Sequence, residues 1–231
     1  MSLRAVFFDA GNTLLRMNYA DIAAALGPLG VATTAAALQA AEWRARVRLD
    51  ADVLAHATST ESRDTHQRYL RYVLEGVGVT DQATIDAVHE WRRGYNAPVG
   101  LWNTADPEAA AALDAVRAAG LRSAVISNSN GTIRSLLTGL GLIGRLDFVI
   151  DSGEEGVEKP DPRIFERAVA RAGVKAEEAA YIGDLYSIDV LGARRAGLRP
   201  VLLDPGACWG ERDCHAAPSV LAAVRLLLAE G

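Results

Sequence analysis

The chain has 231 residues, 50% of them hydrophobic, so it can bury the core of one large domain or two small ones. Its formal net charge of −5 at pH 7 argues against a nucleic-acid-binding surface, although a local cationic pocket can still hold an anionic ligand. No apolar run approaches the length of a membrane span and no signal-peptide pattern is present, so we expect a cytoplasmic protein without nucleic-acid or membrane partners.

Two residue types are scarce enough to be informative. Cys208 and Cys214 are the only cysteines, and their spacing fits neither a close metal-ligand pair nor a thioredoxin-type redox pair. We therefore expect two reduced thiols. Lys159 and Lys175 are the only lysines, so any chemistry that needs a lysine has two positions available.

Residues 4–15 are the stretch around which the chain is organised. The apolar run Ala5–Phe8 predicts a buried strand, and Asp9, Gly11 and Thr13 follow it in a tight turn. Asp9 is therefore expected at the carboxyl end of a strand, where ligands bind in an open α/β sheet. Since an aspartate in this place is also a common helix cap or turn former, this stretch alone does not decide its role.

From Met17 to about Tyr95 the pattern changes to alanine, leucine and arginine at helical spacing, as in Thr34–Leu54 and Ser62–Val77. This pattern predicts an all-helical insert, whose aromatic and basic residues mostly serve helix packing or solvated faces. Asn96–Gly100 then forms a breaker-rich linker. The predicted division is 1–16 with 97–231 as one domain and 17–96 as the other.

After the linker, strand and helix patterns alternate. The expected order is helix Ala109–Ala118, strand Leu121–Ile126, helix Thr132–Leu140, strand Leu146–Ile150, helix Pro162–Ala172, strand Ala179–Ile182, a helix from about Ser187 to Ala196, strand Arg199–Leu203 and helix Ser219–Ala229. Repeated units of this length predict an α/β fold with a parallel sheet covered on both faces.

Polar side chains follow four of the predicted strands. In chain order they are Asp9 with Thr13, Ser127 with Asn128, Lys159, and Asp184 with Asp189. A nucleophilic carboxylate, a hydroxyl and amide pair, a cation and further carboxylates suit attack on a phosphorus atom that carries several negative oxygens. The carboxylate of Asp184 also offers a hard oxygen ligand for Mg²⁺. Each residue alone is more often a cap, a solvated charge or a turn former, so the argument depends on their combination.

In this order, the four positions resemble the motifs of the haloacid dehalogenase (HAD) superfamily, with a helical, C1-type cap inserted after the first strand. The resemblance implies a Rossmann-like catalytic core at 1–16 and 97–231 and a cap domain at 17–96. It covers essentially the whole core. A single motif of this kind is weak, whereas four in the family's order are specific.

The resemblance also implies a role for each matching residue. Asp9 is the nucleophile, Lys159 and Thr13 assist catalysis, and Ser127 and Asn128 bind substrate. Mg²⁺ is the expected cofactor, with Asp9, the Gly11 carbonyl, Asp184 and Asp189 as the metal site. The substrate is a small phosphorylated molecule or a haloacid, bound by a monomer or homodimer.

One position departs from the phosphatases of that superfamily. Their first motif is Asp-x-Asp, and the second carboxylate protonates the leaving group and activates water, whereas this chain has Gly11. General acid and base help, typically worth about 10²–10⁴-fold, is then missing unless another group supplies it. His56 and His66 are candidates because histidine titrates near neutral pH.

Three functions remain open at this point. The carboxylates Asp184 and Asp189 favour a metal-dependent phosphatase, with the aspartyl-phosphate on Asp9. A metal-independent 2-haloacid dehalogenase is compatible with Gly11 and with Trp43-Arg44 in the cap, since an arginine can hold a substrate carboxylate. A phosphonatase would need a cap lysine, and Met17–Tyr95 contains none. That reaction is therefore set aside, and the third open function is a nearly inactive phosphate-binding protein.

Overall fold

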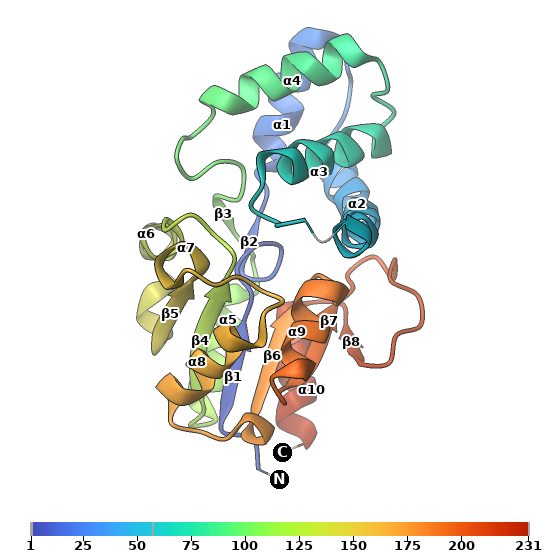
Figure 1. The fold of residues 1–231 in the computed structure, drawn as a ribbon. Coiled ribbons are helices and arrows are strands. Elements are labelled where there is room, and N and C mark those ends of the chain that lie inside the picture. Colours follow the sequence, from blue (N-terminus) through green and yellow to red (C-terminus); the bar gives the residue numbers. More distant parts are fainter. Residues whose placement is uncertain (1, 57, 231) are drawn as a thin grey trace. The chain divides into compact units, whose positions relative to one another are not determined.

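The chain forms two compact units, Met1–Arg16 with Thr104–Gly231 and Met17–Asn103, and the computed structural model describes residues 2–56 and 58–230 (Figure 1). We call the first the α/β unit and the second the helical unit. The predicted boundary fell after residue 96, whereas the helical unit extends to Asn103. Hydrogen bonds explain the difference, because the Asn103 amide donates to the Tyr95 hydroxyl (3.0 Å) and the Asn18 N–H donates to the Leu101 carbonyl (2.8 Å).

The α/β unit contains a parallel sheet whose strands lie in the order β5-β4-β1-β6-β7-β8. These strands are β1 (Ala5–Phe8), β4 (Arg122–Ser127), β5 (Phe148–Asp151), β6 (Ala179–Gly183), β7 (Arg199–Leu203) and β8 (His215–Ala217). Since β1 lies between β4 and β6, it is hydrogen-bonded on both sides and is buried along its whole length.

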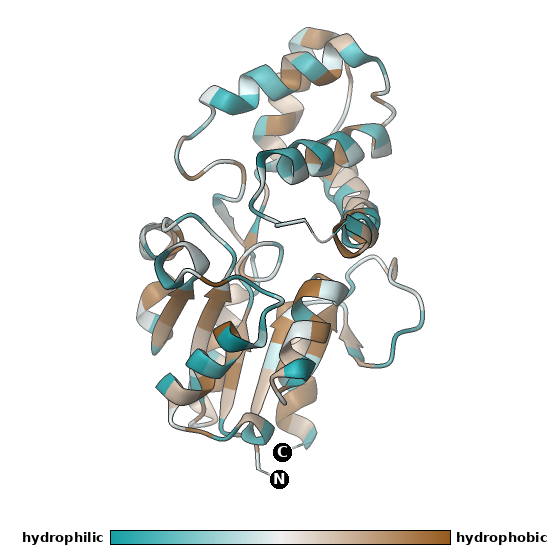
Figure 2. Ribbon diagram, in the orientation of Figure 1, coloured by the Kyte–Doolittle hydropathy of each residue, from teal (hydrophilic) through white to brown (hydrophobic). Residues whose placement is uncertain are grey.

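Side chains alternate between the two faces of the sheet. Val6 and Phe8 belong to one hydrophobic cluster, and Ala5 and Phe7 belong to another. Helices α5 (Ala109–Ala118), α6 (Ile133–Gly139) and α10 (Val220–Glu230) contribute to the first cluster, and α8 (Pro162–Ala172) and α9 (Leu191–Arg195) to the second. Figure 2 shows the strands as mainly hydrophobic. The predicted class, a parallel α/β sheet covered on both faces, is confirmed.

The register of the sheet brings the carboxyl ends of β1, β4 and β6 together. Phe8, the last residue of β1, is paired with Val125 on β4 and Ile182 on β6, and the Asp9 N–H continues the ladder to the Ile182 carbonyl (2.8 Å). The residues that follow β1, β4 and β6 therefore leave the sheet at the same edge.

Several short elements lie outside the predicted set. Strands β2 (Leu15–Arg16) and β3 (Thr104–Ala105) form an antiparallel pair, and β8 adds an edge strand to the main sheet. The helix expected from about Ser187 begins as a π-helix, η4 (Tyr186–Val190), and continues as α9. The remaining short helices are η1 (Gly27–Leu29), η2 (Ile143–Arg145), α7 (Ser152–Glu155) and η3 (Ala176–Glu178).

The helical unit consists of α1 (Tyr19–Leu26), α2 (Ala35–His56), α3 (Arg63–Gly76) and α4 (Gln82–Gly94). A buried carboxylate links three of these helices: Glu42 on α2 accepts hydrogen bonds from Tyr19 on α1, Tyr69 on α3 and Arg46 on α2. Such a paired carboxylate specifies the packing of its neighbours, because an unpaired one would be costly to bury. In the part of the chain that is described, no helix is long and apolar enough to cross a membrane.

Candidate active site

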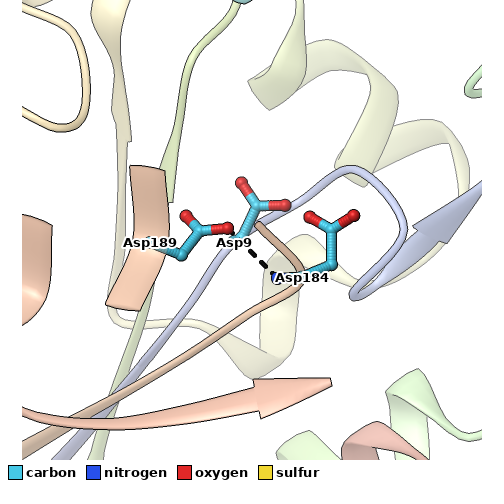
Figure 3. A group of neighbouring side chains, drawn as sticks. All are labelled: Asp9, Asp184 and Asp189. Atoms are coloured by element: carbon cyan, nitrogen blue, oxygen red, sulfur yellow. Dashed lines mark hydrogen bonds between the residues drawn. The ribbon is translucent and has the colours of Figure 1, made fainter. Parts of the chain in front are cut away.

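Three carboxylates meet at the carboxyl edge of the sheet. Asp9 follows β1, Asp184 follows β6, and Asp189 lies on η4. Each contributes an oxygen that lies within 4.8 Å of the other two, and all three residues are buried (Figure 3). Buried carboxylates repel one another unless cations or hydrogen-bond donors balance them, so this cluster requires a compensating charge.

Lys159 supplies part of that charge. Its side chain is 3% exposed, and Nζ donates to Asp9 Oδ1 at 2.5 Å, to Asp189 Oδ1 at 2.8 Å and to the Tyr181 hydroxyl at 2.9 Å. Burial opposes the charge of this ammonium, but Asp189 and Asp9 outweigh that effect and raise the pKa of Lys159. Lys159 is therefore a permanent cation in contact with Asp9.

The surroundings of Asp9, unlike those of Lys159, disfavour the charged form of the side chain. Burial raises the pKa of Asp9 to about 6; the Lys159 ammonium lowers it, and the neighbouring Asp189 adds to the rise. The Asp9 carboxylate is therefore ionised at neutral pH but close to its titration range. A further cation at the cluster would favour the ionised form.

Asp189 turns back onto the loop that carries Asp184. Its Oδ2 accepts the backbone N–H groups of Asp184 (3.1 Å) and Leu185 (3.0 Å), and its Oδ1 faces Lys159. The dashed line in Figure 3 marks the first of these bonds. Both oxygens of Asp189 thus have partners within the protein, which suits a residue that fixes the loop.

Ser127 and Asn128 occupy the end of β4. Ser127 is 4% exposed, and its hydroxyl donates to the carbonyl of Asn128 at 3.2 Å. The Asn128 side-chain amide donates to the Lys159 carbonyl (2.9 Å) and its Oδ1 accepts the Lys159 N–H (2.7 Å). We predicted substrate binding for Asn128, and the structure adds that this side chain positions the Lys159 backbone.

The turn after Asp9 contains the other residues of interest. The Ala10 carbonyl accepts the N–H groups of Thr13, Leu14 and Leu15, which closes the turn. The Thr13 side chain is buried, and among the described residues its Oγ1 has no hydrogen-bond partner. Gly11 is half-buried in the same turn.

Asn12 is a site residue that the sequence did not reveal. It has a φ of 54°, in the left-handed region that asparagine tolerates better than most residues. Its side-chain amide donates to Asp184 Oδ2 at 3.1 Å. Asn12 therefore connects the turn after β1 to the loop after β6.

The chain is similar to known proteins over most of its length. The family model of the haloacid dehalogenase-like hydrolases matches residues 3–197. The chain belongs to this family. A relative from Bos taurus, haloacid dehalogenase-like hydrolase domain-containing protein 3, is 31% identical over 240 residues, which cover 95% of this chain and 92% of the relative.

Another relative carries the name of a phosphatase, and solved structures share the fold of this HAD protein. The phosphoserine phosphatase of Thermus thermophilus is 46% identical over 101 residues, 43% of this chain and 41% of that enzyme. The structure of a HAD phosphatase from Thermococcus onnurineus has a TM-score of 0.60 at 20% identity and covers 97% of this chain and 98% of its own. A dehalogenase structure has a TM-score of 0.62 at 22% identity, with 97% of both chains covered. These structures share the fold.

The geometry therefore gathers Asp9, Asp184, Asp189 and Lys159 into one cluster, with Asn128 bonded to the Lys159 backbone. The candidate acid and base residues of this HAD protein lie in the helical unit. There His56 Nδ1 lies 2.9 Å from the Asp52 carbonyl one turn earlier in α2, and His66 Nε2 lies 3.8 Å from Glu61 Oε1.

Proposed function

We propose that this HAD-like hydrolase cleaves small phosphomonoesters by a Mg²⁺-dependent reaction in which Asp9 is the nucleophile. The observation that carries the proposal is the gathering of Asp184 and Asp189 beside Asp9 and Lys159. Displacement of a halide from a haloacid needs a nucleophile and a place for the halide, whereas a phosphoryl group needs concentrated positive charge around its oxygens. An acidic cluster that can hold a divalent cation serves the second reaction.

The residues present fit a divalent cation. Three buried carboxylates lie close together and one lysine ammonium pairs with two of them, so negative charge is left over, and carboxylate oxygens are the ligands that Mg²⁺ prefers. The buried Thr13 hydroxyl is unpaired among the described residues. In our proposal Asp9, Asp184 and the Gly11 carbonyl hold the ion, and Asp189 acts through the Asp184 loop. When bound, Mg²⁺ would neutralise charge on the phosphoryl oxygens.

The protein's own groups carry the reaction. An Asp9 carboxylate oxygen attacks phosphorus and the bond from phosphorus to the ester oxygen breaks. The ester oxygen leaves with the electron pair of that bond, as an alkoxide or aryloxide that then takes a proton from water. The Lys159 ammonium stabilises the negative charge of the phosphoryl oxygens, and the Ser127 hydroxyl donates a hydrogen bond to them. Water then attacks the phosphorus of the aspartyl-phosphate, which releases inorganic phosphate and restores Asp9.

Gly11 predicts which substrates react fastest. It carries no proton to give to the departing oxygen, so esters whose alcohol leaves readily as an anion are expected to react better than alkyl esters. The same residue is the specific observation in favour of a dehalogenase, because a halide leaves without a proton. Relatives named phosphoserine phosphatase and glyceraldehyde 3-phosphate phosphatase support the phosphatase.

A paired assay separates the two reactions. Purified protein is incubated with p-nitrophenyl phosphate and, separately, with 2-chloropropionate, each with Mg²⁺ and with excess EDTA. We expect phosphate release that requires Mg²⁺ and is lost in Asp9→Asn, with no release of chloride. Chloride release that persists in EDTA would replace the proposal with the dehalogenase, and phosphate release unaffected by EDTA would refute the role given to the metal.

A further inference from the structure

Tyr181 is a buried polar residue in the middle of the sheet. It lies on β6 in register with Phe7 of β1, and its side chain is fully buried. Its ring meets Phe165 of α8 edge-on, with the ring centroids 5.0 Å apart and an interplanar angle of 83°. Because the ring is fully buried and packs against Phe165, the position of the hydroxyl is fixed as well.

The Tyr181 hydroxyl is in contact with two charged residues of the site, Lys159 and Asp189. It is 2.9 Å from Lys159 Nζ, 3.1 Å from Asp189 Oδ1 and 3.2 Å from the Ile126 carbonyl of β4. Its oxygen accepts a hydrogen bond from the ammonium, and its single proton can be donated to Asp189 or to the carbonyl. One neutral side chain thus connects β4, Lys159 and Asp189.

All three hydrogens of the Lys159 ammonium have acceptors in this arrangement. Two are carboxylates, on Asp9 and Asp189, and the third is the Tyr181 hydroxyl. An ammonium on a flexible four-carbon chain rotates and tilts unless its donors are fixed. A third, rigid acceptor leaves one orientation that satisfies every donor, and in a buried site an unsatisfied donor is costly.

We infer that Tyr181 is a positioning residue that fixes the Lys159 ammonium between Asp9 and Asp189. The catalytic consequence of this inference rests on the proposed function, because it assumes that the charge of Lys159 stabilises the phosphoryl oxygens. The Tyr181 hydroxyl contacts Lys159 and Asp189, and its effect is exerted through Lys159. Its contribution is to keep the cation aimed at the place where charge develops.

The small number of lysines allows a direct test that does not depend on activity. Protein labelled with ¹⁵N at lysine Nζ contains two labelled ammonium groups, on buried Lys159 and exposed Lys175. In Lys175→Arg, Lys159 is the only lysine left, so the one remaining signal is assigned to it. In Tyr181→Phe, which keeps the ring and removes the hydroxyl, we expect the Lys159 signal to shift and its hydrogens to exchange with water about tenfold faster, because one hydrogen bond to a charged group is lost.

The kinetic comparison uses p-nitrophenyl phosphate with saturating Mg²⁺. Tyr181→Phe is expected to lower kcat about tenfold and to leave KM within about twofold, since the hydroxyl does not touch the substrate. The matched control is Tyr72→Phe, which removes a hydroxyl bonded to the Asp52 carboxylate in the helical unit and is expected to change neither kcat nor the Lys159 signal. Thermal unfolding and circular dichroism confirm that both variants are folded.

The possible outcomes separate this inference from the proposed function. An unchanged Lys159 signal in Tyr181→Phe would overturn the inference. An altered signal with an unchanged kcat would overturn its catalytic consequence. If the wild-type protein released no phosphate, the proposed function would fail, while the lysine signal would still decide whether Tyr181 orients Lys159.

Discussion

Asp189 packs directly against the α-carbon of Gly183. A side-chain carbon placed on Gly183 would lie closer than 3.0 Å to Cγ, Cβ and Oδ2 of Asp189, a separation that real side chains do not adopt. Glycine at the end of β6 therefore lets Asp189 reach the Asp184 and Leu185 N–H groups. The conformation of the segment from Asp184 to Asp189 therefore depends on glycine at position 183 as well as on the carboxylates.

Replacing Gly183 should thus damage the site. In Gly183→Ala we expect kcat for an aryl phosphate to fall at least tenfold, because Asp189 must move away from Lys159 and the loop, and the free energy of unfolding to fall by about 1–3 kcal/mol from overpacking. Gly139→Ala is the control: this residue lies on α6, and an added Cβ would meet no atom within 4 Å. Equal activity in the two variants would contradict the role given to the close contact.

Asn12 offers a test of the metal site itself. Asn12→Gly keeps a backbone that accepts a φ of 54° and removes the amide that donates to Asp184 Oδ2. Loss of such an outer partner typically weakens metal affinity about 10–100-fold, so we expect a rise of this size in the dissociation constant for Mn²⁺, measured by electron paramagnetic resonance without substrate. Asn12→Ala should show the same loss together with lower thermal stability. Unchanged affinity in Asn12→Gly would contradict the proposal.

The pH dependence of activity follows from Asp9. Since burial raises its pKa to about 6 and only the ionised carboxylate attacks, kcat/KM should fall as the pH decreases through about 6. Mg²⁺ at the cluster favours the ionised form, so raising its concentration should move this acidic limb to lower pH. Rate profiles at low and saturating Mg²⁺ test the point, and an acidic limb that ignores Mg²⁺ would indicate that another group titrates.

Gly11 can be tested by restoring the missing carboxylate. Gly11→Asp should accelerate hydrolysis of an alkyl phosphate more than that of p-nitrophenyl phosphate, because only the alkyl leaving group needs a proton; general acid catalysis is typically worth about 10²–10⁴-fold. The ratio of the two kcat/KM values is the measurement. An equal or slower alkyl rate would mean that the turn does not accept the side chain or that another acid already serves.

Much of the α/β unit could be predicted because its signals are local. The helix expected at Pro162–Ala172 forms with those bounds, since Asp161 caps it and Pro162 occupies its first turn. Strands β4 and β6 lie within one or two residues of their predicted positions for a similar reason: short apolar runs end at glycine or polar residues. The motif residues could therefore be placed at strand ends before the sheet order was known.

What escaped prediction depends on contacts between distant residues. Strands β2 and β3 are two residues long and exist only because they pair with each other. Asn12 and Asp184 are 172 positions apart, so nothing local links the amide to that carboxylate. For Tyr181 the sequence offers only a weak indication. A tyrosine in the apolar run Ala179–Gly183 is expected to be buried and to need a hydrogen-bond partner for its hydroxyl, but the register of the sheet decides which residue that partner is.

The central claim is that Asp9 forms a bond to phosphorus, and trapping that bond tests it most directly. Protein mixed with p-nitrophenyl phosphate and Mg²⁺ is quenched during turnover and treated with borohydride, which reduces an aspartyl-phosphate to homoserine and leaves free aspartate unchanged. Trypsin then releases residues 5–16, in which Asp9 is the only carboxylic side chain. We predict homoserine at position 9 only when substrate and Mg²⁺ are both present. Aspartate at that position under turnover conditions, with phosphate still being released, would contradict the account.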